Sequence, residues 1–153
     1  LSKTERLIEG INSGEWFPSN YDKTHDLSEV LAYELSKYWD VSFNFAYQTG
    51  RPITYPNGKF ITDGIIAPIY NNRNGARTPD YHRMDVSANY EFKKNADKNF
   101  KQSLNFSIYN LYARRNPYSI YFRQNEDNPE ITEAVQLSIF ANLIPSITYN
   151  FEF

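Results

Sequence analysis

Arginine and aromatic residues gather between positions 114 and 123, and this stretch carries the clearest binding chemistry in the sequence. The side chains concerned are Arg114, Arg115, Tyr118, Tyr121 and Arg123. Guanidinium groups beside aromatic rings suit an anionic or sugar-like ligand. The alternative is ion pairing with Glu126 and Asp127, because exposed charge clusters are usually solvated. The five residues are therefore candidate ligand contacts, with a solvated loop as the alternative.

Catalytic chemistry is not indicated elsewhere in the sequence. The two histidines, His25 and His82, lie far apart, whereas a metal site needs several convergent ligands. Cysteine is absent, and neither a Gly-x-Ser-x-Gly elbow nor a glycine-rich phosphate loop is present. We expect no catalysis, no metal and no cofactor. Asp80, His82 and Arg83 precede a predicted strand, where an anchoring role is expected rather than ligand contact.

Composition excludes two broad classes of function. The chain of 153 residues has a net charge of −2, so it lacks the basic footprint of a nucleic-acid-binding protein. Mean hydropathy is −0.66, and no stretch is long and apolar enough to predict a transmembrane helix. Against this polar background, 13 tyrosines, 11 phenylalanines and 2 tryptophans form a heavy aromatic load.

Alternation of apolar and polar residues predicts an all-β protein of five antiparallel strands. The clearest runs are 39–49 and 84–92, and weaker runs cover 25–35, 102–112 and 143–153. The last run keeps its phase back to residue 135, which favours one very long strand with a bulge or loosened pairing at Pro145. Residues 130–143 are the one place where the sequence allows a short helix, and 2–6 suggests the end of a sixth strand.

The links between the predicted strands alternate in length. Links 36–38 and 93–101 are short, whereas links 50–83 and 113–142 are long. This order predicts an up-and-down meander with tight turns at one end and long loops at the other, as in outer-membrane barrels. Strands of nine to eleven residues suit a tilted membrane crossing, and aromatic residues near their ends suit the membrane interfaces. A soluble β-sandwich, in which two apolar faces pack together, is the alternative.

Four stretches of the chain carry a resemblance to a known family. They are 14–23 (GEWFPSNYDK), 46–52 (AYQTGRP), 79–87 (PDYHRMDVS), and 109–118 (YNLYARRNPY) taken with the ending 145–153 (PSITYNFEF). In this order and spacing, they resemble the C-terminal end of the β-barrel of a TonB-dependent outer-membrane receptor. The resemblance spans nearly the whole chain, but the plug, the TonB-contacting segment and most of the barrel of that family are absent.

The resemblance implies that residues 1–153 form one partial domain of a barrel in the outer membrane of a Gram-negative cell. Active uptake of an unknown nutrient ligand would follow, with energy from the TonB system acting through the missing plug. Barrels of this type have about 22 strands, and five strands cannot close a membrane barrel, so we expect a larger protein. The alternatives are a passive outer-membrane channel and a soluble carbohydrate-binding module.

Two sets of residues follow from this interpretation. Outer-membrane lipid would contact the apolar strand faces, and the barrel-assembly machinery would recognise the aromatic ending of the last strand. The predicted lipid-facing residues are Trp39, Val41, Phe43, Phe45, Tyr47, Met84, Val86, Ala88, Tyr90, Phe92, Leu104, Phe106 and Ile108. The predicted assembly signal is Ile147, Tyr149, Phe151 and Phe153.

Overall fold

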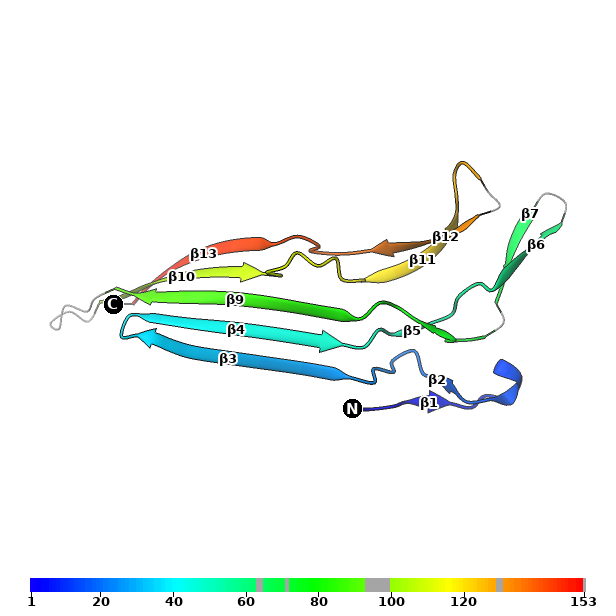
Figure 1. Cartoon of the computed structure of the whole chain (residues 1–153), viewed down its shortest axis with the longest axis horizontal. Coiled ribbons are helices and arrows are strands. Elements are labelled where there is room, and N and C mark those ends of the chain that lie inside the picture. Colours follow the sequence, from blue (N-terminus) through cyan, green and yellow to red (C-terminus); the bar gives the residue numbers. More distant parts are fainter. Residues whose placement is uncertain (63–64, 71, 93–99, 129–130, 153) are drawn as a thin grey trace. The chain divides into compact units, whose positions relative to one another are not determined.

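The computed structural model describes residues 1–62, 65–70, 72–92, 100–128 and 131–152. The chain divides into two compact units, which we call the loop unit and the sheet unit (Figure 1). The loop unit comprises Leu1–Asp26, Gln48–Tyr81 and Pro117–Ile139, and the sheet unit comprises Leu27–Tyr47, His82–Asn116 and Phe140–Phe153. Among the described residues, no helix is long and apolar enough to cross a membrane.

Five long strands build the main sheet. They are β3 (Asp26–Ser36), β4 (Trp39–Gln48), β9 (Tyr81–Glu91), β10 (Lys101–Tyr109) and β13 (Ile144–Glu152). Their order is β13-β10-β9-β4-β3, so neighbours in the sheet are also successive long strands along the chain, and their arrows alternate in direction (Figure 1). The predicted all-β class and antiparallel meander of five strands are confirmed.

The register separates an apolar face from a polar face. Phe106 of β10 lies opposite Ala88 of β9 and Ile147 of β13. Because successive side chains point to opposite faces of a sheet, the residues between these positions share the other face. Its matching rows are Ser87–Ser107–Ser146 and Asn89–Asn105–Thr148. The alternation in the sequence therefore becomes a two-faced sheet in the folded chain.

The long links carry more structure than their sequences indicated. Link 50–83 contains the hairpin β6 (Gly58–Thr62) and β7 (Ile65–Ile69), together with the short pair β5 (Pro52–Ile53) and β8 (Ala76–Arg77). Link 113–142 contains the hairpin β11 (Ser119–Gln124) and β12 (Thr132–Leu137). The links predicted as long loops therefore contain strand pairs of their own.

Three local predictions for the C-terminal part are also wrong. The run from 135 to 153 is not one strand, because β12 ends at Leu137 and β13 begins at Ile144, with Phe140 at a φ of 52° between them. The described part of 130–143 holds a strand and no helix. Pro145 lies opposite Ile108 in an uninterrupted register without a bulge. An edge strand such as β13 tolerates proline wherever no hydrogen bond to its neighbour is needed.

The N-terminal segment forms a small pairing of its own. β1 (Glu5–Arg6) pairs with β2 (Phe17–Pro18), and a 3-10 turn, η1 (Asn12–Gly14), lies between them. The strand end predicted near 2–6 therefore exists, but it is not a member of the five-stranded sheet. Most of the predicted link 93–101 lies outside the described residues, as does the terminal Phe153.

The described part of the chain has almost no hydrophobic core. Phe17 is the only large apolar side chain buried among these residues. On the apolar face of the sheet, exposed fractions reach 39% at Phe106 on a central strand and 68% at Ile147 on an edge strand. A soluble domain normally buries such side chains against a second layer, so an apolar face of this extent calls for a partner or a non-aqueous surrounding.

Candidate functional site

The apolar face collects the predicted lipid-facing residues of three strands. Trp39 of β4 lies against Tyr90 of β9, with ring centroids 4.9 Å apart. This contact links the predicted lipid-facing residues of β4 to those of β9. The predicted lipid-facing residues of β9 and β10 lie opposite one another, since Leu104 pairs with Tyr90 and Ile108 pairs with Val86. By strand alternation, the other predicted residues of these strands lie on the same face. The structure thus brings the set together, while contact with lipid stays a prediction.

Aromatic rings form a band across the short-turn end of this face. Tyr90 is 5.2 Å from Phe92, Phe92 is 6.5 Å from Tyr149, and Tyr149 is 5.9 Å from Phe151, measured between ring centroids. We call Trp39 and these four residues the aromatic band. The hydroxyl group of Tyr149 donates a hydrogen bond of 2.7 Å to the Gln102 side chain, so this ring has a polar tip and an apolar body. Such amphipathic rings concentrate where a membrane meets water.

The opposite face carries small polar side chains and charged pairs, among them Lys101 with Glu152 at 3.2 Å. The hydroxyl oxygens of Ser42 and Ser87 are 2.8 Å apart and link β4 to β9. Arg83 pairs with Asp85 at 2.9 Å, and its guanidinium carbon lies 4.2 Å from the centre of the Tyr109 ring. Arg83 and Asp85 are therefore charges that have partners on this face.

The predicted anchoring residues do anchor the chain. The Asp80 carboxylate accepts a hydrogen bond of 2.8 Å from the Gly50 amide. The His82 amide donates to the Asn116 side chain at 3.1 Å, and Asn116 returns a bond of 2.9 Å to the His82 carbonyl. Together with the Arg83–Asp85 pair, these contacts confirm the polar anchoring predicted for the start of β9.

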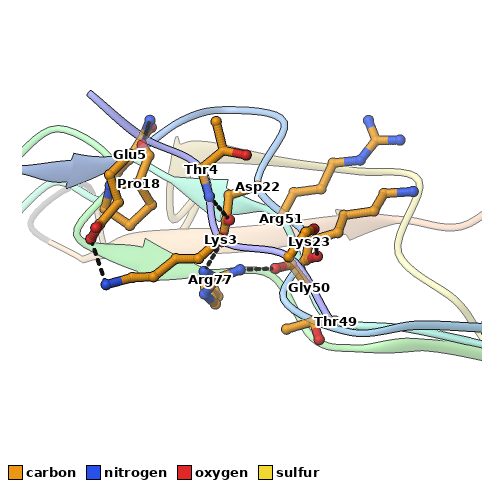
Figure 2. Close-up of polar contacts among 12 residues, drawn as sticks. Lys3, Thr4, Glu5, Pro18, Asp22, Lys23, Thr49, Gly50, Arg51 and Arg77 are labelled. Atoms are coloured by element: carbon orange, nitrogen blue, oxygen red, sulfur yellow. Dashed lines mark hydrogen bonds and ion pairs between the residues drawn. The ribbon is translucent and has the colours of Figure 1, made fainter.

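A polar clamp organises the loop unit, and we define it as Thr4, Asp22, Gly50 and Arg77 (Figure 2). The Asp22 carboxylate is 1% exposed and accepts hydrogen bonds from the Thr4 amide, at 2.7 Å, and from the Arg77 guanidinium group. Arg77 also donates to the Gly50 carbonyl at 2.9 Å. Four stretches that are distant in sequence are thereby tied together through one buried carboxylate and one arginine.

The clamp makes local stability dependent on pH. Hydrogen bonds from Arg77 and from the Thr4 amide hold the pKa of Asp22 below its usual range. The pKa of Asp22 is thus lower in the folded chain than in the unfolded chain, so the ionised carboxylate stabilises the folded state. This stabilisation is complete above the pKa of an unfolded aspartate, about 3.9, and is lost as the pH falls through the lower pKa of Asp22 in the folded chain.

Asp22→Asn should destabilise the clamp by about 1–2 kcal/mol, a range reduced by solvent screening because Arg77 is 34% exposed. Hydrogen exchange at the Thr4 amide measures the effect. In the parent protein, the Thr4 amide should be protected from exchange at pH 6 and should lose this protection below about pH 4. In Asp22→Asn, the Thr4 amide should be weakly protected at both pH values. Glu5→Gln is the control, because the Lys3–Glu5 pair is exposed. Equal protection of Asp22→Asn and the parent at pH 6 would contradict the role of the clamp.

Gly50 permits the close approach on which the clamp depends. A Cβ atom at this position would lie 1.7 Å from the Thr78 carbonyl oxygen. Gly50→Ala should therefore separate the two segments, at a cost of about 1–3 kcal/mol. The measurement is hydrogen exchange at the Thr78 amide, which donates to the Arg51 carbonyl at 2.9 Å. Gly58→Ala is the matched control, since its nearest neighbour is an Ile69 methyl group at 3.9 Å. Similar exchange in both variants would refute the close-packing argument.

The five candidate ligand contacts do not form one cluster within a unit. Tyr121 and Arg123 lie on β11 of the loop unit, and Tyr118 just precedes that strand, whereas Arg114 and Arg115 belong to the sheet unit. Arg123 pairs with Glu126 at 3.5 Å and with Glu133 at 3.2 Å. A hydrogen bond from Asn125, and secondarily the Arg123 contact, keep the pKa of Glu133 below its usual range. For Arg123 the contacts match the ion-pairing alternative, with Glu133 in place of Asp127.

Sequence reasoning missed the clamp and a second buried polar residue. Asp22 and Arg77 are 55 positions apart, so no local spacing signals their contact. Asn74 is 6% exposed, and its side-chain amide donates to the Pro18 carbonyl at 2.7 Å. A buried asparagine in a long link has no distinguishing pattern in a single sequence.

Comparison with known proteins adds no assignment to this geometry. No protein-family model, no curated protein sequence and no solved structure matches the chain.

Proposed function

We propose that the sheet unit is part of the wall of an outer-membrane β-barrel. We further propose that the chain is the C-terminal portion of a TonB-dependent receptor for nutrient uptake. The observation that carries the membrane proposal is the aromatic band along one end of an uncovered apolar face. In a bilayer, that face contacts lipid and the band lies at the interface, where the Tyr149 hydroxyl group reaches polar partners.

Strand length supports the same conclusion. The five strands have nine to eleven residues. A tilted transmembrane strand needs about 9–11 residues to cross the hydrocarbon region. The polar rows of serine, asparagine and threonine suit a lumen that is filled with water or with a plug.

The two edges of the sheet argue that more strands complete the wall. β3 and β13 are edge strands of an open sheet. Lipid cannot satisfy the unpaired N–H and C=O groups of an edge, so a membrane-spanning sheet must close. Closure with about 22 strands is what the resemblance to TonB-dependent receptors implies. The assembly machinery would capture β13 through Ile147, Tyr149 and Phe151, with the terminal Phe153 beyond the described residues.

Membrane fractionation tests the location. The full-length protein that carries this chain should stay with outer-membrane vesicles through high-salt and alkaline washes and should need detergent for extraction. Recovery in the soluble fraction without detergent would overturn the membrane proposal and favour the soluble binding module.

A second measurement separates the receptor from a passive channel. Uptake of the nutrient should stop when the TonB system is deleted or the inner-membrane proton gradient is collapsed. Uptake that continues unchanged under both treatments would identify a passive barrel instead.

A further inference from the structure

A small cleft in the loop unit has the features of a ligand-binding site. Its cavity volume is about 260 Å³, and its walls come from Lys23, 48–51, 78–79 with Tyr81, and 117–119. Pockets for drug-sized ligands typically measure about 300–1,000 Å³, so this cleft suits a compound of about one ring.

The two charged residues that line the cleft are both basic. Lys23 and Arg51 line it, and none of the described residues that line it is acidic. Lys23 is already engaged, because its ammonium group donates to Gln48 at 2.7 Å and lies 4.0 Å from Asp26. Within the described part of the chain, the exposed guanidinium group of Arg51 has no hydrogen-bond or ion-pair partner. Arg51 is therefore the cation available to a ligand.

The rest of the cleft supplies ring surfaces on a fixed floor. Tyr81 and Tyr118 line the walls, and Tyr118 is strongly exposed. The floor at Gly50 is held on both sides, since Asp80 accepts from its amide and Arg77 donates to its carbonyl group. Figure 2 shows the Lys23 and Arg51 side chains extending away from the Asp22–Arg77 pair. The clamp thus fixes the backbone from which the Arg51 side chain projects.

We propose that this cleft binds a small ring compound bearing a carboxylate. The planar guanidinium group of Arg51 takes the carboxylate through paired hydrogen bonds, and Lys23 adds a weaker attraction. The flat faces of Tyr118 and Tyr81 contact the ring. Binding at the cleft does not depend on transport. The inference rests on the proposed function only where it identifies the bound compound as the transported nutrient.

Isothermal titration of the purified full-length protein in detergent tests the inference with two ring carboxylates, glucuronate and benzoate. Methyl glucoside and benzyl alcohol are the neutral counterparts. We expect at least one carboxylate to bind about tenfold or more tightly than its neutral counterpart, and less tightly at high salt. Glucuronate alone would indicate a sugar acid, benzoate alone an aromatic acid, and both a general ring carboxylate. Binding of neither, or equal binding of the neutral compounds, would overturn the proposal.

Matched variants locate the binding. Arg51→Ala should weaken carboxylate binding about tenfold or more, Arg51→Lys should weaken it less, and Lys23→Met should weaken it less than Arg51→Ala. Arg73→Ala is the control, because Arg73 is an exposed arginine of the same unit that does not line the cleft. Since the Arg51 side chain has no partner among the described residues, its loss should leave the fold intact, as limited proteolysis can verify. Equal effects of Arg51→Ala and Arg73→Ala would refute the site.

The two proposals fail in different ways. A protein that fractionates with the outer membrane but binds no ring carboxylate would overturn the cleft proposal alone. A soluble protein whose carboxylate binding depends on Arg51 would overturn the membrane proposal alone.

Discussion

Phe106→Arg should prevent stable insertion of the protein into the outer membrane, whereas Asn105→Arg should be tolerated. Phe106 lies on the central part of β10, between Ala88 and Ile147 on the apolar face. An arginine on the lipid face near the bilayer midplane costs about 2–4 kcal/mol. Its neighbour Asn105 belongs to the polar rows, where a charged side chain can stay hydrated. Two substitutions by the same residue at adjacent positions should therefore differ sharply.

The measurement is the fraction of protein that withstands alkaline extraction of outer membranes. The parent protein and Asn105→Arg should be retained, and Phe106→Arg should be depleted about thirtyfold or more, the fold-change that corresponds to the lower end of that energy range. Equal retention of the two variants would contradict a lipid-facing role for Phe106. Loss of Asn105→Arg alone would indicate that the faces are assigned the wrong way round.

Phe151→Ser should strongly reduce assembly of the barrel. Phe151 closes the aromatic band on the edge strand β13, 5.9 Å from Tyr149 between ring centroids. Burying a phenylalanine side chain is worth about 1.5–3 kcal/mol, so its loss should weaken capture of β13 about tenfold or more. Pulse-labelling followed by outer-membrane isolation measures the assembled fraction. Deleting Phe153 should act in the same direction.

Asn150→Ser provides the control for β13. Asn150 precedes Phe151 but points to the polar face, where its amide group lies 3.4 Å from the Ser103 hydroxyl group. Its substitution should leave assembly close to the parent level. Normal assembly of Phe151→Ser and of the Phe153 deletion would refute the assembly-signal hypothesis.

The five long strands could be predicted because their signal is local. A strand with one apolar face repeats every two residues, and 39–48 and 81–91 keep that period almost throughout. The sequence pattern did not predict the hairpin β6–β7, because Ile65, Ile66 and Ala67 are apolar in succession and show no alternation. The pattern also did not predict the break between β12 and β13, because here the alternation does not stop where the strand stops. There the alternation continues through residues 138–143, although Phe140 takes a positive φ that few non-glycine residues adopt.

The binding features depend on contacts that no local pattern records. The Asp22–Arg77 pair joins positions far apart in sequence, and the cleft around Arg51 takes its walls from four separate stretches. The arginine cluster identified from sequence illustrates the same limit. Arg114 and Arg123 are close along the chain, yet they belong to different units. Proximity in sequence therefore does not place these residues within one unit.

Cysteine labelling along β10 is the most direct test of the two-faced membrane wall. The chain has no cysteine, so single cysteines at 104, 105, 106 and 107 are introduced into a full-length protein in which any cysteine outside this chain is replaced by serine. In intact outer membranes, a water-soluble maleimide should modify positions 105 and 107 and spare 104 and 106. Denaturation should make all four positions reactive. Uniform labelling of the four positions in the membrane, or protection of 105 and 107 with reaction at 104 and 106, would contradict a sheet whose apolar face meets lipid.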